Sequence, residues 1–140
     1  MNYPLYLQNL IEGKKGMNPY LDYFDISVVE IGDGRAVFEM PIRSEYFQGA
    51  KVMQGGLITA MADETIAHAM MTLLLPDEGL ATIELKSNFL ASVSSGYLIS
   101  RASVFKKGKS LILGDCIVSD EKNKLVCRVS ATFMLLTKKK

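Results

Sequence analysis

The sequence GGLITAMADETIAHAMMTLLL, residues 55–75, decides the fold of this chain. It is rich in good helix formers and meets no proline before Pro76, so it predicts a helix over residues 57–74. Apolar side chains cover nearly its whole circumference, and such a helix must be enclosed by protein. Asp63 and Glu64 lie in its middle, where each acid would cost about 2.5–3.5 kcal/mol in a bilayer. We therefore expect a buried helix and no membrane span.

On both sides of this helix the apolar pattern changes to the two-residue period of β-strands. Residues 26–31 and 35–41 flank Gly32-Asp33-Gly34, which predicts a hairpin because the turn requires positive φ. Four more strand candidates follow the helix: residues 82–90, 96–105, 110–119 and 124–136. In the last of these, one face is predicted to carry Leu125, Cys127, Val129, Ala131, Phe133 and Leu135, with Val126 on the other face. Six strands and one helix favour a curved antiparallel sheet wrapped around that helix, an α+β fold.

The length of 140 residues and a hydrophobic content of 49% fit a single domain with one core. Residues 1–24 are expected to form a leading helix, ending at Gly13, and a lead-in to the sheet. Residues 138–140 are expected to form a solvated basic tail. A sheet of this kind leaves its ends and outer face uncovered, so we expect a homodimer or a homotetramer.

The charge balance gives no sign of a polyanionic partner. Sixteen Lys and Arg residues oppose fifteen Asp and Glu residues, and the net charge of +1 draws the protein neither to nucleic acid nor to an anionic membrane. Cys116 and Cys127 are too few for a disulfide scaffold and are expected to be reduced core thiols. The N-terminus lacks the pattern of a secretory signal, so we expect a cytoplasmic protein.

Several kinds of chemistry are excluded by the residue inventory. His68 is the only histidine, so no two-histidine metal site can form, and we expect no bound metal. No nucleophile elbow and no phosphate-binding loop occurs. His68 lies four residues after Glu64, and a structural pair on one helix surface explains this spacing better than catalysis does.

The remaining polar residues around the helix start suggest a site for a carbonyl group. Gly55 and Gly56 leave the free N–H groups of the helix start unobstructed, which suits a carbonyl oxygen. An alternative is that both glycines form a tight turn with positive φ. Asp63 shares a helix face with Gly56 but lies about 10 Å further along the axis. If both serve one reaction, the acid must come from a neighbouring subunit; the alternative is an Asp that is hydrogen-bonded in the fold or faces solvent.

With these residues in place, the chain resembles the hotdog-fold acyl-CoA thioesterases of the PaaI-like (phenylacetic acid degradation) branch of the 4-hydroxybenzoyl-CoA thioesterase superfamily. In that family an Asn precedes a His-Gly-Gly motif, and an acid follows nine residues after the His. Here Gln48 stands at the Asn position, Gln54 at the His position and Asp63 at the acid. The strand motif of the family is reproduced by Thr82, Glu84, Leu85, Asn88, Phe89 and Leu90. The resemblance covers about residues 25–137.

The resemblance implies hydrolysis of an acyl-CoA thioester, with coenzyme A present only as part of the substrate and no other cofactor. It makes Asp63 the nucleophile or the general base, while the Gly55 N–H and the Gln54 amide hold the thioester oxygen. Gln48 would orient the water or the acid, and Thr82 would lie near the water. Gln54 keeps a neutral donor but cannot transfer protons as an imidazole does. Two alternatives remain: a non-catalytic acyl-CoA binding domain, and a hydratase or dehydratase, which normally needs a His beside its acid.

The same resemblance suggests where the rest of the substrate binds. A basic group before and on a β-turn is expected to meet the phosphates of coenzyme A, and its alternative is a solvated hairpin tip. Methionines and an aromatic ring are expected to line an apolar acyl pocket between subunits, with core packing as the alternative. The expected substrate-binding residues are Gly56, Asn88, Phe89, Met61, Arg101, Lys106, Lys107 and Lys109, with Met70 and Met71 as further candidate pocket walls.

Overall fold

The computed structural model describes residues 1–137 and contains one six-stranded sheet in the order β1-β2-β4-β5-β6-β3. All neighbouring strands are antiparallel. The strands are β1 (Ser27–Gly32), β2 (Arg35–Pro41), β3 (Glu78–Phe89), β4 (Tyr97–Lys107), β5 (Leu111–Asp120) and β6 (Leu125–Thr137). The helices are α1 (Tyr3–Ile11), α2 (Pro19–Tyr23), the short 3-10 helix η1 (Ser44–Tyr46) and α3 (Gly55–Met71).

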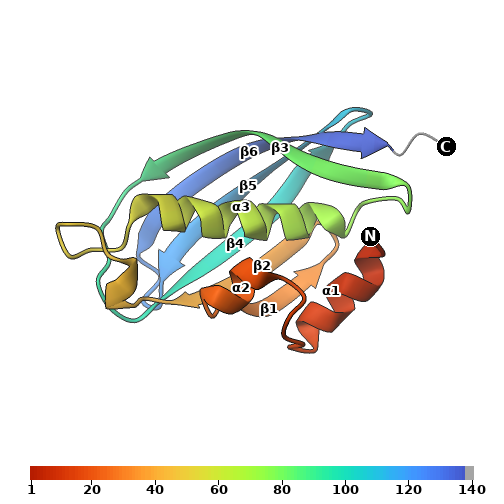
Figure 1. Cartoon of the computed structure of the whole chain (residues 1–140). Helices are drawn as coiled ribbons and strands as arrows, with labels where there is room; N and C mark the ends of the chain where they lie inside the picture. Colours follow the sequence, from red (N-terminus) through yellow and green to blue (C-terminus); the bar gives the residue numbers. More distant parts are fainter. Residues whose placement is uncertain (138–140) are drawn as a thin grey trace.

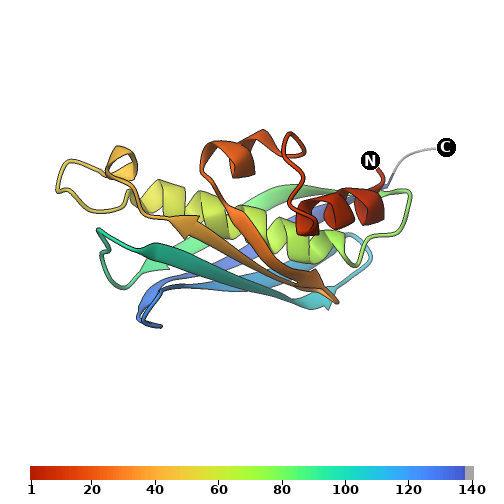
Figure 2. The ribbon, with the colours of Figure 1, turned by 90° about the horizontal axis from the view of Figure 1, so that it is seen from below.

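The sheet curves around α3, which lies across its inner face (Figure 1). Seen from below, the sheet and α2 lie on opposite sides of α3, and α1 lies beside the C-terminal end of α3 (Figure 2). This arrangement confirms the predicted α+β hotdog architecture. The predicted basic tail, residues 138–140, falls outside the described residues.

The hairpin between β1 and β2 confirms the predicted turn. Asp33 and Gly34 have φ values of 48° and 74°, the left-handed conformation that a tight hairpin needs. The N–H of Gly34 donates to the Thr72 hydroxyl at 2.7 Å, so the turn is also tied to the end of α3.

The inner face of the sheet carries the core, with one departure from simple alternation. Cys116 and Cys127 are buried free thiols, as predicted. In β6, however, Val126 is fully buried although it was predicted to face outwards, and Leu125 is 41% exposed although it was predicted to face inwards. The pairing of β5 with β6 shifts register next to this point, and such a shift reverses the face of the following side chains.

Helix α3 begins two residues and ends three residues earlier than predicted, and part of its surface is not buried in the single chain. The prediction that protein encloses it all round is wrong for the single chain. Its sheet-facing side is buried, whereas a stripe along the helix, which we call the open stripe, is exposed at Gly56 and only half-buried at Ala60, Asp63, Ala67 and Met71. Within residues 1–137, no helix has both the length and the apolar character needed to cross a membrane.

The N-terminal segment contains the predicted leading helix, α1, and a second short helix that the sequence analysis missed. Asn18 caps α2, because its side-chain oxygen accepts the N–H groups of Tyr20 and Leu21 at 3.1 and 3.3 Å. Pro19 occupies the first helical position, where a missing N–H costs nothing. The cap fixes the orientation of the Asn18 amide.

Phe38 tests the packing of this core. It is fully buried on β2, so Phe38→Ala should lower the free energy of unfolding by about 3–5 kcal/mol. Val29→Ala is the matched control, because Val29 lies in the same hairpin but is 56% exposed, and it should change stability by less than about 1 kcal/mol. Urea unfolding at one fixed protein concentration measures both, and equal losses would contradict the assigned core.

Candidate active site

The N-terminus of α3 is shaped by the side chain of Gln54, the residue before the helix. Its Oε1 accepts the N–H of Leu57 at 2.9 Å and caps the helix. This leaves the Nε2 amide as a free donor beside the first turn. As the first two residues of α3, Gly55 and Gly56 carry N–H groups that the helix itself leaves without acceptors. Three neutral donors therefore gather at one helix end, where the helix dipole also favours negative charge.

Gly55 and Gly56 stand out by their close contacts and not by an unusual backbone conformation. Neither has a positive φ, so the alternative prediction of a left-handed turn is wrong. A Cβ on Gly55 would lie 3.1 Å from two ring carbons of Phe89. A Cβ on Gly56 would lie 2.8 Å from Oε1 of Gln54. The two glycines thus let a ring and an amide pack directly on the helix start.

A shallow pocket of about 390 Å³ opens beside this helix start. Gln48 borders it from the loop after η1, and the Gln48 Oε1 accepts the N–H of Ala50 at 2.6 Å, so its Nε2 remains available. The pocket is lined by Gln48, Met53, Gly55, Ile58, Phe89, Leu90, Ala91 and Ser92. The structure therefore brings the predicted residues Gln48, Gly55 and Phe89 together in one pocket.

Asp63 lies two turns further along α3 and is held by the edge strand. Thr82 Oγ1 donates to Asp63 Oδ1 at 3.2 Å, which places the predicted Thr82 beside the predicted acid. Burial raises the pKa of the Asp63 carboxyl, and the neighbouring charge of Glu64 raises it further, while the bond from Thr82 lowers it. A carboxylate in this setting is a stronger base than one in water.

A β-bulge aims Thr82 at the helix. On β3 the side chains of Ser87 and Phe89 contact α3, so strict alternation would turn Thr82 to the outer face. The pairing of β3 with β6 shifts register between Thr82 and Glu84, and this shift returns Thr82 to the inner face. Asn88 precedes Phe89 on the strand, so its side chain lies on the opposite face, where it is exposed. The structure therefore does not bring Asn88 to the pocket.

Three contacts join α3 to β3 in order along both elements. Phe89 packs on Gly55, the Ser87 and Thr59 hydroxyls are 2.9 Å apart, and Thr82 binds Asp63. Gly55 and Asp63 are eight residues apart and thus about 12 Å apart along the helix axis. One subunit therefore does not bring the donors of the helix start to the carboxylate.

Behind Asp63, a buried polar network connects α3 with the N-terminal segment. His68 Nδ1 lies 2.6 Å from the main-chain oxygen of Glu64 and 3.7 Å from its carboxylate, which agrees with the predicted structural role of His68. Tyr6 and Asn18 complete the network. The Tyr6 hydroxyl lies 2.9 Å from His68 Nε2, and Asn18 Nδ2 lies 3.0 Å from Glu64 Oε2. The sequence analysis missed both, because only tertiary packing brings positions so far apart in the chain into contact.

The predicted basic group does not form one cluster. Lys107 Nζ donates to the main-chain oxygen of Leu73 at 2.8 Å and pairs with Glu78 at 2.5 Å, so it ties the β4–β5 turn to the C-terminal end of α3. Arg101 lies six residues before Lys107 on β4, and its guanidinium donates to the Ser119 hydroxyl at 3.1 Å. Lys106 and Lys109 are exposed near the turn. Within one subunit these residues lie away from the Gly55 end of the helix.

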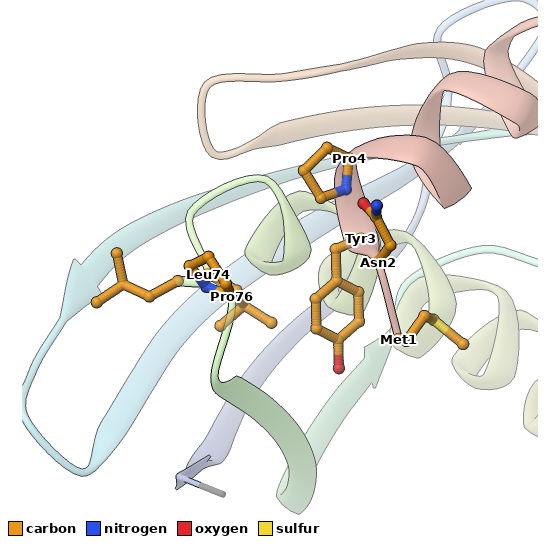
Figure 3. A pocket seen from close by; sticks show the side chains of 7 residues that line it. Met1, Asn2, Tyr3, Pro4, Leu74 and Pro76 are labelled. Carbon is orange, nitrogen blue, oxygen red and sulfur yellow. The ribbon is translucent and has the colours of Figure 1, made fainter.

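The predicted methionine walls lie mostly in the core. Met61 and Met70 are fully buried between α3 and the sheet, while Met71 is half-buried on the open stripe. A second pocket, of about 340 Å³, lies at the opposite end of α3 (Figure 3). It is lined by Met1, Asn2, Tyr3, Pro4, Leu74, Leu75 and Pro76 and contains no predicted site residue. Among residues 1–137, no three His, Cys, Asp or Glu side chains gather as a metal site would require.

Comparison with known proteins places this geometry in a family. The chain is 26% identical over 115 residues to the 1,4-dihydroxy-2-naphthoyl-CoA hydrolase of Listeria monocytogenes, covering 82% of this chain and 94% of that protein. A thioesterase structure from Haemophilus influenzae has the same fold, with a TM-score of 0.83, 23% identity, and coverage of 94% of this chain and 90% of that one. A conserved protein of Pseudomonas aeruginosa superposes with a TM-score of 0.80 at 26% identity, and the match covers 85% of this chain and 94% of that one.

The model of the thioesterase superfamily matches residues 50–127, which is more than half of the chain and includes the capped helix start, Asp63 and Thr82. Together with the hotdog architecture, this match shows that the chain belongs to the thioesterase superfamily, a family of hydrolases.

Proposed function

We propose that the protein hydrolyses an acyl-CoA thioester at a site shared by two copies of the chain. The observation that carries this proposal is the separation of two complementary half-sites on α3. The donors at Gln54 and Gly55 lie at one point of the helix, and the half-buried acid Asp63 lies about 12 Å away. The relative from Listeria monocytogenes, whose name describes a CoA-thioester hydrolase, supports the substrate class.

The edge strand β3 offers a way to bring the half-sites together. It is the last strand of the sheet, so one edge of its backbone is unpaired, and Ile83 and Phe89 are 51% and 55% exposed. In a two-fold dimer, β3 pairs antiparallel with the same strand of the second copy. Pairing the Phe89 end with the Thr82 end of the other copy then carries Gly55 of one subunit towards Asp63 of the other.

In this dimer the thioester oxygen accepts hydrogen bonds from the Gly55 N–H and the Gln54 Nε2 of one subunit. Asp63 of the other subunit takes a proton from water, and the hydroxide attacks the carbonyl carbon. The tetrahedral intermediate then expels the coenzyme A thiolate, which receives the proton, and the free acid remains. In the second form of the proposal, the Asp63 carboxylate attacks the carbonyl carbon and expels the coenzyme A thiolate, which leaves a mixed anhydride. Water then hydrolyses the anhydride, so that the free acid leaves, Asp63 is regenerated and the released proton passes to the thiolate. Thr82 occupies Oδ1 of Asp63 and leaves Oδ2 for the reaction.

Some of the other predicted residues also have places in this proposal. The Gln48 Nε2 borders the pocket and can orient the water, and the apolar sides of the pocket, including Ile58 and Phe89, suit the acyl group. Lys106 and Lys109 are exposed near the C-terminal end of α3, towards which the dimer carries the helix start of the other copy. They are proposed to meet the phosphates of coenzyme A, which enters only as part of the substrate.

A non-catalytic acyl-CoA binding module is the second candidate, and the observation that favours it is Gln54. The amide has no proton-transfer ability, so the site has its donors without the imidazole found at this position in the family that the chain resembles. Both candidates bind the same ligand, and they differ only in whether Asp63 acts on it.

Asp63→Asn separates the two candidates. The change keeps the shape and removes the base, so thiol release from an acyl-CoA panel should fall by about 10²–10⁴-fold. Because the pKa of Asp63 is raised and its ionised form acts, wild-type activity should be lost as the pH falls through that pKa. Asp77→Asn removes an exposed acid and serves as the control. Equal rates for Asp63→Asn and wild type would refute hydrolysis by this site, and binding without thiol release in wild type would favour the binding module.

Subunit complementation tests whether the site is shared. Gln54→Ala and Asp63→Asn chains should each be nearly inactive, but their mixed dimer contains one site with both native residues. Co-expression with random pairing should therefore restore about a quarter of the wild-type sites. Each variant alone, at the same total concentration, is the control. A mixture no more active than its two components would place both residues in one subunit.

Gly56→Ala tests the shape of the helix start. The new Cβ would lie 2.8 Å from the Gln54 amide, so it should displace the cap and the Nε2 donor together. Loss of one such donor should lower kcat by about 10²-fold. Gly32→Ala is the matched control, because nothing lies within 4 Å of its added Cβ and its φ is not positive. Steady-state kinetics measures both, and an unchanged kcat for Gly56→Ala would remove Gln54 from the proposed donor set.

A further inference from the structure

Two acids follow one another on α3 and face different neighbours. Asp63 faces the edge strand and is bound by Thr82, whereas Glu64 faces the N-terminal segment and is bound by Asn18. The Glu64 side chain is only 30% exposed, and its Oε2 lies 3.0 Å from Asn18 Nδ2. The contact with Asn18 therefore fixes the second carboxylate on the side of α3 that faces the N-terminal segment, at the position directly after Asp63 in the helix.

The hydrogen bonds around Glu64 have one consistent direction. Because the Asn18 Oδ1 caps α2, its Nδ2 must be the donor both to Glu64 and to the Tyr6 hydroxyl, which is 3.1 Å away. The Tyr6 hydroxyl then donates to His68 Nε2 at 2.9 Å, and the Nδ1–H of His68 donates to the main-chain oxygen of Glu64. These directions require a neutral His68, and burial, which lowers its pKa, favours that form.

No positive charge offsets the two acids in the described part of the chain. The groups that interact with them are the phenols of Tyr6 and Tyr20, the Asn18 amide, His68 and the Thr82 hydroxyl. Among residues 1–137, no Lys or Arg forms a salt bridge with either carboxylate. Burial raises the pKa of Glu64, and burial together with both acids raises the pKa of Tyr20, whose buried hydroxyl finds no partner within these residues.

We propose that Glu64 is a positioning residue of the thioester site, which acts on the reaction through Asp63. Held by Asn18, it keeps a negative charge beside Asp63 and makes that carboxylate a stronger base towards water. The proposal rests on the proposed function of Asp63. Asn18 and Tyr6 lie outside residues 50–127, the part that the family model matches. The residues that hold Glu64 therefore come from the N-terminal segment and not from the matched part of the chain.

The pH dependence of kcat/KM tests the proposal with two variants of one residue. Glu64→Gln keeps an oxygen for Asn18 but removes the charge, so ionised Asp63 becomes easier to form. The acidic limb of the profile should move to lower pH by about half a unit to one unit. The kcat at neutral pH should fall several-fold, because a weaker base accepts the proton less readily. Glu64→Asp keeps the charge and should restore the wild-type limb.

A structural role alone would give a different result. If Glu64 only anchors Asn18, the Asp variant should be at least as damaging as the Gln variant, and neither should move the acidic limb. Such a result would overturn the proposal. Glu30→Gln, an exposed acid on β1, is the control and should leave the profile unchanged.

Titration of the Asp63 carboxyl by ¹³C NMR gives a readout that does not need substrate. The Asp63 resonance is assigned by its loss in Asp63→Asn, and its midpoint should be lower in Glu64→Gln than in wild type by the same half to one pH unit. If Asp63→Asn hydrolyses thioesters at the wild-type rate, the proposed function fails, and with it the catalytic part of this inference. If Asp63→Asn is inactive but the midpoint does not move in Glu64→Gln, the inference alone fails.

Discussion

The attachment of α3 to the edge strand β3 is the constraint on which the candidate site depends. Side chains on one face of a helix recur every three or four residues, and those on one face of a strand recur every two. For α3 to pack along β3, residues 55, 59 and 63 must therefore each meet a residue from the inner face of β3. The match holds for Phe89 and Ser87 but would fail at Thr82 without the bulge. One inserted residue therefore decides whether the strand presents the Thr82 hydroxyl to the acid.

The same attachment leaves two incomplete surfaces on one side of the molecule. The free backbone edge of β3 and the open stripe of α3 adjoin each other along this side, because β3 and α3 are in direct contact. Another strand can pair with the free N–H and C=O groups of a strand edge, and another helix or a ligand can cover a helix stripe of mostly small residues. A second copy of the chain offers both at once. The half-buried state of Asp63 in the single chain fits this view, because the acid lies where the two incomplete surfaces meet.

The strands, the long helix and the hairpin turn could be predicted because their signals are local: a two-residue period, glycine and aspartate at a turn, a run of helix formers. The position of the acid relative to the glycines also follows from helix geometry. The features missed are those that tertiary contacts create. The bulge near Ile83, the packing of Phe89 on Gly55 and the bond from Asn18 to Glu64 join residues far apart in the sequence, and no local pattern records them. The short helix α2 is different, because its signal is local: Asn18 followed by Pro19 is a typical helix start, from which this helix could have been predicted.

Gln54 links the two ends of the proposed reaction. Because its Oε1 is committed to the helix cap, the side chain can offer only a neutral N–H to the substrate, and it can neither accept nor deliver a proton. In the proposed reaction, Asp63 would carry out all proton transfer, so the basicity of that one carboxylate would matter more than in a site with an imidazole. The Glu64 carboxylate, which Asn18 holds, is the neighbouring charge that we propose to raise this basicity. In the proposed reaction, the glutamine at the helix start and the glutamate beside the acid would therefore be complementary: Gln54 carries no proton, and Glu64 would strengthen the one remaining base, Asp63.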